Sequence, residues 1–266
     1  MTVISKEPHL PIDRTKLSKA LIADADKLAL RNSAWFKATS IDFVMDEVVG
    51  VDFGGKKVST AGRKEFPYTK LVLATGGTPR TLRLEGFSTL EDIFVLRTIS
   101  DVKSINAAVG EEKGRQIVVI GSSFIGMEVA KALAGKGHKV VVVGMEKAPL
   151  ERVIGAEVGI GLQKQLEGVD VKFFMEASVE SASPLHPGST KVAAVKLKDG
   201  TKLPADLVIL GVGVAPATEY LKGNPDVQLE RDGSIKVDES FSIIGLKDVY
   251  AIGSSPLAID FPVARC

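Results

Sequence analysis

The feature that most constrains the fold is a strand, a glycine turn and a helix in direct succession over residues 115–128, RQIVVIGSSFIGME. The β-branched run Gln116–Ile120 predicts a strand covered on both faces. Gly121 allows a tight turn, Gly126 allows a helix to pack closely on the strand, and that helix is expected over Phe124–Leu133. The segment therefore predicts a layered α/β fold.

The same segment has the features of a dinucleotide-binding turn. Backbone N–H groups at the helix start, including those of Phe124 and Ile125, and the positive end of the helix dipole would face a pyrophosphate. A second strand is expected at Lys139–Val143. Glu146 follows it about twenty residues after Gly126, where a carboxylate accepts the adenosine ribose hydroxyls. The alternative is an ordinary strand–helix–strand unit whose two glycines hold no ligand.

The turn departs from the pattern G-x-G-x-x-G at its middle position, where Ser123 replaces glycine. A Cβ at this position obstructs the approach of the backbone to the phosphates. If Ser123 adopts a positive φ, the strain is about 1–2 kcal/mol, which corresponds to a roughly tenfold loss of affinity. We therefore expect Ser123 to weaken the site without abolishing it.

Composition limits the class of protein. The 266 residues, 45% hydrophobic and 25% charged, allow one large or two modest globular domains. A net charge of +1 without long runs of like charge gives no reason to expect binding to nucleic acid or an anionic membrane. The longest apolar stretch, 207–217, is too short to span a bilayer, and the N-terminus has no signal-peptide core. We expect a cytoplasmic protein, with a mitochondrial location as the alternative.

Cysteine and histidine content excludes several kinds of chemistry. The single cysteine is Cys266, so a dithiol relay, a structural zinc site and an intramolecular disulfide are excluded. The three histidines, His9, His138 and His186, have no metal-ligand spacing, and each is expected at the surface or in a turn. No metal site is predicted.

The chain contains an internal repeat. Residues 66–79, FPYTKLVLATGGTP, and 203–216, LPADLVILGVGVAP, share a proline, an apolar strand, glycines and a second proline. Each segment follows antiparallel strands with a glycine turn, at 52–57 and 192–203. The repeat predicts two related units. By this match the first unit is expected to begin at its second strand, Thr2–Ser5, without a glycine turn and helix of its own.

Further motifs extend over most of the chain: LPIDRTKLSK (10–19), the turn Ala74-Thr75-Gly76, LRT (96–98) with Asp101, GSSFIGMEVA (121–130) and VYAIG (249–253). Together they resemble the two-dinucleotide flavoproteins of the pyridine nucleotide–disulfide oxidoreductase fold. The branch they resemble most holds apoptosis-inducing-factor-like proteins and ferredoxin or rubredoxin reductases.

The resemblance implies an α/β fold of two Rossmann-like, three-layer nucleotide-binding units with antiparallel β-meanders. An NAD(P) unit over residues 98–222 would be inserted into an incomplete FAD unit formed by residues 1–97 and 223–266. The family's C-terminal interface domain is not expected in this sequence.

The resemblance also implies a catalytic pair. Arg14 and Lys19 would face the flavin end of FAD, and Glu128 would pair with Lys19 near flavin N5. An ammonium there stabilises the electron-rich reduced flavin, while the carboxylate restrains the lysine. The alternative is that Lys19 and Glu128 are solvated and unrelated.

The remaining cofactor contacts implied by the resemblance are with FAD from Glu7, Ala74, Thr75, Gly76, Arg97 and Gly253, and with NAD(P)H from Gly121, Ser123, Phe124, Ile125, Gly126, Glu146 and Gly213. The alternatives are a turn residue for Glu7, a linker charge for Arg97 and plain strand ends for the rest. After Gly253 the family has an aspartate where this chain has Ser254. The lost charged hydrogen bond costs about 1.5–3 kcal/mol, unless Asp260 substitutes for it.

Three functions are compatible with the sequence. The first is a FAD-dependent NAD(P)H oxidoreductase that passes electrons to a one-electron acceptor such as an iron–sulfur protein, or to a quinone or oxygen. NADH is favoured over NADPH because Glu146 would repel a 2′-phosphate and no arginine stands beside it. The second is a non-catalytic nucleotide-binding module, or an inactive fragment of such an enzyme, in which only the NAD unit is competent. The third is a redox-linked signalling protein in which NADH changes association.

Overall fold

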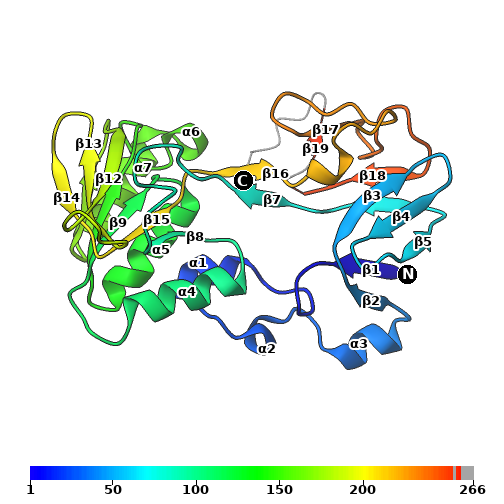
Figure 1. The fold of residues 1–266 in the computed structure, drawn as a ribbon, viewed down its shortest axis with the longest axis horizontal. Coiled ribbons are helices and arrows are strands. Elements are labelled where there is room, and N and C mark those ends of the chain that lie inside the picture. Colours follow the sequence, from blue (N-terminus) through cyan, green and yellow to red (C-terminus); the bar gives the residue numbers. More distant parts are fainter. Residues whose placement is uncertain (254–255, 259–266) are drawn as a thin grey trace. The chain divides into compact units, whose positions relative to one another are not determined.

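The computed structural model describes residues 1–253 and the backbone of 256–258 (Figure 1). The chain forms two compact units. Unit 1 contains Met1–Ile12, Ala29–Thr78 and the chain from Val214 onward, and unit 2 contains Asp13–Leu28 and Pro79–Gly213. The predicted α/β class is confirmed, with both parallel sheets and antiparallel meanders present. The predicted domain limits remain a prediction, because contact-based units need not coincide with domains.

A parallel sheet in the order β11-β10-β9-β15-β8 forms the centre of unit 2. Its strands are β8 (Ile93–Val95), β9 (Gln116–Ile120), β10 (Lys139–Val143), β11 (Val171–Phe174) and β15 (Leu207–Leu210). The strands predicted at Gln116–Ile120 and Lys139–Val143 are confirmed. Val118, Val119 and Val208 are fully buried, as expected for a sheet covered on both faces.

Helices cover one face of this sheet and a meander covers the other. The helices of unit 2 are α1 (Thr15–Ala20), α2 (Ala25–Leu28), α4 (Ile99–Val109), α5 (Phe124–Gly135), α6 (Glu151–Ile154) and α7 (Ala156–Glu167). The antiparallel meander consists of β12 (Val179–Pro184), β13 (Val192–Leu197) and β14 (Lys202–Pro204). Val195 and Leu197 of β13 pack with Ile120 and Val208 of the sheet in one apolar cluster.

Unit 1 is built from smaller sheets. Its antiparallel meander is β3 (Val48–Asp52), β4 (Lys57–Thr60) and β5 (Glu65–Pro67). Its parallel pairs are β1 (Thr2–Ser5) with β2 (Asp42–Met45), β6 (Leu71–Leu73) with β18 (Val249–Ala251), and β17 (Ile235–Val237) with β19 (Pro256–Ala258). The strand predicted at Thr2–Ser5 is confirmed. The helices are α3 (Ser33–Ala38) and a 3-10 turn, η1 (Glu219–Leu221).

The two repeated segments form the same succession of elements. Each has a meander strand, a parallel strand and a short terminal strand: β5, β6 and β7 (Gly77–Pro79) in one, and β14, β15 and β16 (Val214–Pro216) in the other. The terminal strands β7 and β16 pair with each other. Across the described residues, no helix is both long and apolar enough to cross a membrane.

One of the three histidines lies in the turn between α5 and β10, in keeping with the expectation of a surface or turn position, but its side chain is not at the surface. His138, directly before β10, is buried, with 6% of its surface exposed. Its backbone N–H donates to the Leu133 carbonyl, 3.3 Å away, which turns the chain from α5 into β10. Burial, followed by the nearby Lys136 and Arg115 cations, holds the pKa of His138 below its usual value. The imidazole is therefore neutral in the folded protein near pH 7.

Candidate functional site

The glycine turn between β9 and α5 leaves no room for side chains at its glycines. Gly121 has φ +107°, and a Cβ on it would overlap the Gly211 carbonyl group. A Cβ on Gly126 would overlap the Gly121 carbonyl oxygen. Both glycines are thus required by backbone conformation or by close helix–strand packing. Gly211, at the end of β15, was not predicted.

Hydrogen bonds fix this turn at the carboxyl ends of three neighbouring strands. The Gly121 N–H donates to the Val143 carbonyl at 2.8 Å, and the Gly211 N–H donates to the Ile120 carbonyl at 2.7 Å. The Leu150 N–H donates to the Ser122 carbonyl at 3.0 Å. This edge of an open parallel sheet is where α/β proteins bind ligands.

Ser123 does not carry the strain that the sequence suggested. It has φ −76° and ψ 177°, an extended conformation that serine adopts without penalty. Its Oγ donates to the Gly211 carbonyl oxygen at 3.0 Å. The estimated tenfold loss of affinity through positive φ therefore does not apply, and Ser123 links the turn to the end of β15.

The first turn of α5 is available to an anion. No side chain caps this helix end, and its first turn contains no acidic residue. The N–H groups of Phe124, Ile125 and Gly126 have no carbonyl partner inside the helix, as at any helix start. They and the positive end of the helix dipole favour bound negative charge, such as a pyrophosphate.

Glu146 lies beyond β10 with an arginine beside it. Its Oε1 is 3.0 Å from Nε of Arg152, and its Oε2 accepts from Ser122 Oγ at 3.4 Å. The expectation that no arginine stands beside Glu146 is wrong, because the chain turns back and brings α6 to this carboxylate. At Gly144 a Cβ would come within 2.6 Å of Ser122 Oγ and 2.8 Å of Met175 Cε, so a larger residue there would require these side chains to move.

The predicted catalytic pair is formed by α1 and α5. Lys19 Nζ lies 3.9 Å from Glu128 Oε1. Ser18 Oγ donates to Glu128 Oε2 at 2.5 Å, and Ser18 is buried. Ser18 was not predicted as a site residue, although it stands next to Lys19 in the same motif. The role of Lys19 and Glu128 beside a flavin remains a prediction.

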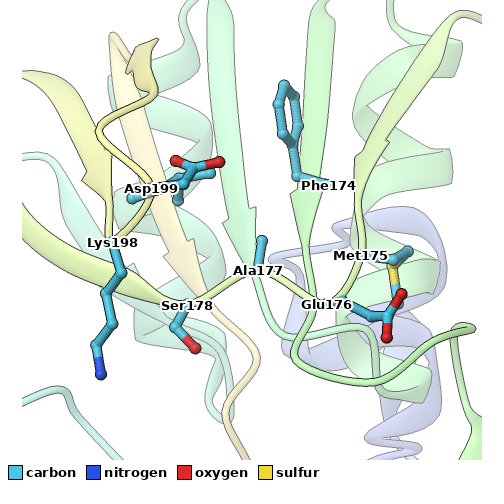
Figure 2. A pocket seen from close by; sticks show the side chains of 8 residues that line it. Phe174, Met175, Glu176, Ala177, Ser178, Lys198 and Asp199 are labelled. Carbon is cyan, nitrogen blue, oxygen red and sulfur yellow. The ribbon is translucent and has the colours of Figure 1, made fainter.

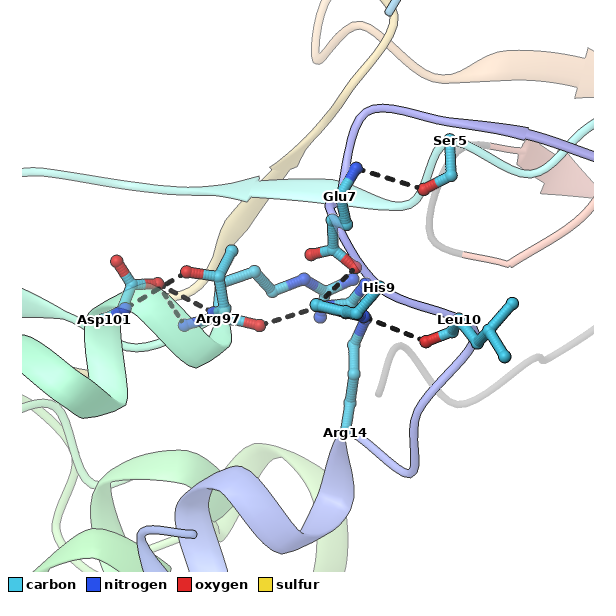
Figure 3. A network of polar contacts seen from close by, with 8 residues as sticks. Ser5, Glu7, His9, Leu10, Arg14, Arg97 and Asp101 are labelled. Carbon is cyan, nitrogen blue, oxygen red and sulfur yellow. Dashed lines mark hydrogen bonds and ion pairs between the residues drawn. The ribbon is translucent and has the colours of Figure 1, made fainter. Parts of the chain in front are cut away.

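Arg14 and Arg97 meet through the backbone, as Figure 3 shows. Arg14 Nη1 donates to the Arg97 carbonyl oxygen at 3.0 Å. The N–H groups of Arg97 and Thr98 both donate to Asp101 Oδ2, at 2.9 and 2.7 Å, and Thr98 and Asp101 form a capping box on α4. The LRT motif and Asp101 thus fix the carbonyl that positions Arg14.

In unit 1, two predicted turns lie at one sheet edge. Ala74, Thr75 and Gly76 follow β6, and Gly253 follows the parallel neighbour β18. Gly76 and Gly253 have φ +69° and +85°. The Ile252 N–H donates to the Leu73 carbonyl at 3.0 Å, which holds the two strand ends together.

Glu7 lies after β1 in unit 1, also visible in Figure 3. Its N–H donates to Ser5 Oγ at 3.3 Å, and its Oε2 is 3.8 Å from His9 Nε2. In unit 2, Gly213 has φ +90° and its carbonyl accepts from the Arg80 N–H at 2.9 Å. Ser254, Asp260 and Cys266 lie outside the described residues.

A pocket of about 360 Å³ lies between the end of β11 and the β13–β14 turn (Figure 2). It is lined by Phe174, Met175, Glu176, Ala177, Ser178, Leu197, Lys198 and Asp199. The Glu176 N–H donates to the Glu146 carbonyl at 2.9 Å, so the pocket borders the loop that carries Glu146. No predicted site residue lines it.

The sequence of this chain is similar to those of known oxidoreductases. Residues 1–256 match the family model described as pyridine nucleotide-disulphide oxidoreductase. Apoptosis-inducing factor 3 of Mus musculus is 38% identical over 257 residues, which are 96% of this chain and 40% of that protein. Rubredoxin-NAD(+) reductase of Pseudomonas putida is 30% identical over 96% of this chain and 65% of its own length.

Among solved structures, a ferredoxin reductase from Rhodopseudomonas palustris superposes with a TM-score of 0.88 at 30% identity. The match covers 97% of this chain and 62% of that one. The chain therefore spans less than two thirds of the length of each of these three similar proteins.

Proposed function

Because this chain belongs to the pyridine nucleotide-disulphide oxidoreductase family, we propose that it acts with FAD as an NAD(P)H-dependent oxidoreductase. The proposed electron acceptor is an iron–sulfur protein. Similarity to a protein named ferredoxin reductase and to one named rubredoxin reductase supports that choice of acceptor.

The nucleotide half of the proposal rests on unit 2. The N–H groups at the start of α5 would bind the pyrophosphate, and Gly121 would let the backbone approach it. Glu146 would accept hydrogen bonds from the adenosine ribose. The single observation that carries the proposal is the turn itself, in which a Cβ on Gly121 or Gly126 overlaps backbone and the helix that follows has no side-chain cap.

The flavin half rests on two separate observations, one made within each unit. FAD bound to this chain would supply the chemistry that joins two-electron hydride transfer from a reduced nicotinamide to one-electron transfer to an acceptor. The Lys19 ammonium would stabilise negative charge, while Glu128, held by Ser18, restrains the lysine. In unit 1, Gly76 and Gly253 have positive φ and lie at one sheet edge, and their lack of a side chain fits a closely approaching cofactor.

Absorption spectroscopy tests the flavin half directly. The purified chain, incubated with FAD and desalted, is expected to be yellow and to bleach when NADH is added without oxygen. A chain that stays colourless after incubation with FAD would contradict the flavin half. A yellow protein that NADH does not bleach would contradict electron transfer from NADH.

A second candidate is an NAD-binding module without turnover. The predicted NAD(P)H contacts all belong to unit 2, whereas the predicted FAD contacts are divided between the units. Under this candidate the chain binds NADH in calorimetry yet remains colourless with FAD. A yellow protein that NADH bleaches would exclude it.

A further inference from the structure

A tyrosine in unit 1 carries a buried hydroxyl group that completes no hydrogen bond. Tyr220 belongs to η1, and its hydroxyl oxygen is buried without a partner among the described residues. A buried polar group left unsatisfied lowers stability, so each one in a folded protein calls for an explanation. Phenylalanine would fill the same space without that loss. The hydroxyl is therefore expected to serve a state in which it has a partner.

The 3-10 turn that carries Tyr220 is fixed on both sides. Before it, Thr218 is buried and its Oγ1 donates to the Gly233 carbonyl at 2.6 Å. After it, Asn224 Nδ2 donates to the Val51 carbonyl of β3 at 2.8 Å. The fold of unit 1 therefore holds Tyr220 in place.

The segment around η1 lies against the turn that follows β6, residues 74–76. The ring of Tyr220 packs against the apolar cluster of unit 1 that contains Leu73, the last residue of β6. The Ala217 N–H donates to the Gly76 carbonyl at 2.9 Å. The turn that the resemblance assigns to FAD is thus supported from the side of η1.

The turn residue beside the Tyr220 hydroxyl is Thr75. Burial raises the pKa of Tyr220, and hydrogen bonding by the Thr75 side chain acts in the opposite direction. The two side chains are thus close, although they fall short of the distance or alignment of a full hydrogen bond. A threonine hydroxyl has one proton to donate and two lone pairs with which to accept, so Thr75 can serve Tyr220 and a ligand at the same time.

We propose that Tyr220 is a positioning residue for FAD, and that its hydroxyl donates to Thr75 once the cofactor occupies the turn. The inference rests on the proposed function, since it requires FAD at the end of β6. Thr75 Oγ1 donates to a polar oxygen of the cofactor, and a hydroxyl that donates becomes a better acceptor for the next donor in the chain. The Tyr220 hydroxyl then gains the partner that the described residues do not supply. The loss of stability that it causes is thereby converted into cofactor affinity.

Two measurements on the full chain test this inference. The melting temperature is recorded without FAD, and the dissociation constant for FAD is measured from the change in flavin fluorescence on binding. Both are determined for the wild type, Tyr220→Phe, Thr75→Val and the variant that combines these two substitutions.

Tyr68→Phe is the matched control. Tyr68 packs against the same apolar cluster, and its hydroxyl is also buried without a partner among the residues that the structure describes. It lies elsewhere in unit 1, directly after β5. Burial raises the pKa of Tyr68 too, and the charges that add to this rise are those of Asp52 and Asp226. Of the two hydroxyls, that of Tyr220 is the one beside Thr75.

We expect Tyr220→Phe and Tyr68→Phe each to raise the melting temperature without FAD by about 2–4 °C, because each removes an unsatisfied buried hydroxyl. Tyr220→Phe weakens FAD binding by about three- to tenfold, the effect of losing one hydrogen bond. Tyr68→Phe changes FAD binding by less than about twofold. Thr75→Val weakens FAD binding as well, and adding Tyr220→Phe to it produces no further loss, because the two residues act through one contact.

Opposite effects on stability and affinity identify the proposed role, since a purely structural tyrosine changes both in the same direction. If the wild type binds no FAD, the flavin half of the proposed function fails and the inference fails with it. If the wild type binds FAD and Tyr220→Phe leaves that affinity unchanged, or lowers the melting temperature together with the affinity, the inference fails while the proposed function stands. An equal loss of FAD affinity in Tyr68→Phe also overturns the inference. Circular dichroism checks that each variant is folded.

Discussion

At the scale of single residues, Gly121 makes the sharpest prediction. Gly121→Ala should lower the free energy of unfolding by at least about 1–2 kcal/mol, because alanine is strained at φ +107° and its Cβ overlaps the Gly211 carbonyl. NADH affinity should fall by about tenfold or more as the turn is distorted. Chemical denaturation and calorimetry measure the two effects.

Gly135→Ala is the matched control for Gly121→Ala. Gly135 ends the same helix, and a Cβ there would meet nothing within 4 Å. The substitution should leave NADH affinity unchanged and alter stability by less than about 1 kcal/mol, in the stabilising direction. If Gly121→Ala behaved like Gly135→Ala, the turn would not have the geometry described.

His138 predicts a pH dependence of stability. Burial holds the pKa of His138 in the folded state below the 6.5 that is usual for histidine, so the unfolded chain binds the proton first as the pH falls. The stability contributed by the neutral imidazole is complete above about pH 6.5 and is lost progressively below it. The melting temperature of the wild type should therefore fall as the pH is lowered from about 7.5 to about 5. In His138→Gln the melting temperature should fall by less over the same range.

His186→Gln is the control for this titration, because His186 is exposed. Its profile should follow the wild type across the same pH range. Parallel curves for His138→Gln and the wild type would show that His138 does not contribute to the acid sensitivity.

At this scale the sequence predicts the residues whose signal is local. Gly121, Gly126 and Glu146 stand at fixed intervals along one strand–turn–helix, so the spacing alone predicts them. Gly211 and Arg152 were missed because they approach the turn only after the chain has folded back. The affinity loss estimated for Ser123 was conditional on a positive φ, and the extended conformation at the start of α5 does not meet that condition.

At the scale of elements, α7 contains two glycines with opposite expected effects. A Cβ on Gly159 would overlap the Pro149 carbonyl oxygen, whereas Gly161, two positions later, has open space. Gly159→Ala should destabilise by about 1–3 kcal/mol through overpacking, and Gly161→Ala should stabilise by about 0.5–1 kcal/mol. Thermal denaturation compares the two; stabilisation by both would mean that α7 does not pack closely on the Pro149 loop.

The contact between α1 and α5 gives another prediction. Ser18→Ala removes a buried donor to Glu128 and should cost about 1–2 kcal/mol of stability. Lys19→Ala, its neighbour, should cost less than about 1 kcal/mol, since that lysine side chain is 57% exposed. Urea denaturation separates them, and a larger effect for Lys19→Ala would contradict the assignment of Ser18 as the residue that holds the carboxylate.

Strong apolar runs explain which elements the sequence predicted well. The strands at Thr2–Ser5, Gln116–Ile120 and Lys139–Val143 begin and end where they were expected. The helix α5 runs to Gly135 instead of Leu133, an ordinary uncertainty at helix ends. The single-turn helices α2 and α6 were not predicted, because four residues are too few to show a 3.6-residue period.

At the scale of the whole molecule, the two related units differ in how their sheets are built. In unit 2, β9 lies between β10 and β15 in the middle of one five-stranded sheet. In the described part of unit 1, β1 and β6, which match β10 and β15 in the repeat, belong to separate two-stranded sheets. The duplication predicted a common pattern, but it did not predict this division, since pairing partners are chosen by the whole fold.

This difference predicts unequal local stability. Two-stranded sheets are marginal alone, so the amides of β1 and β6 should exchange with deuterium through local opening, while those of β9 and β15 exchange only on global unfolding of unit 2. Saturating NADH, at about 100 times its Kd, should raise the free energy of opening for the amides of β9 and β15 by up to about 2.7 kcal/mol and slow their exchange accordingly. The exchange of the β1 amides should change little. Hydrogen exchange read by mass spectrometry resolves these segments. Uniform protection across both units, or equal slowing by NADH in β1 and β9, would mean that the chain unfolds as a single cooperative structure.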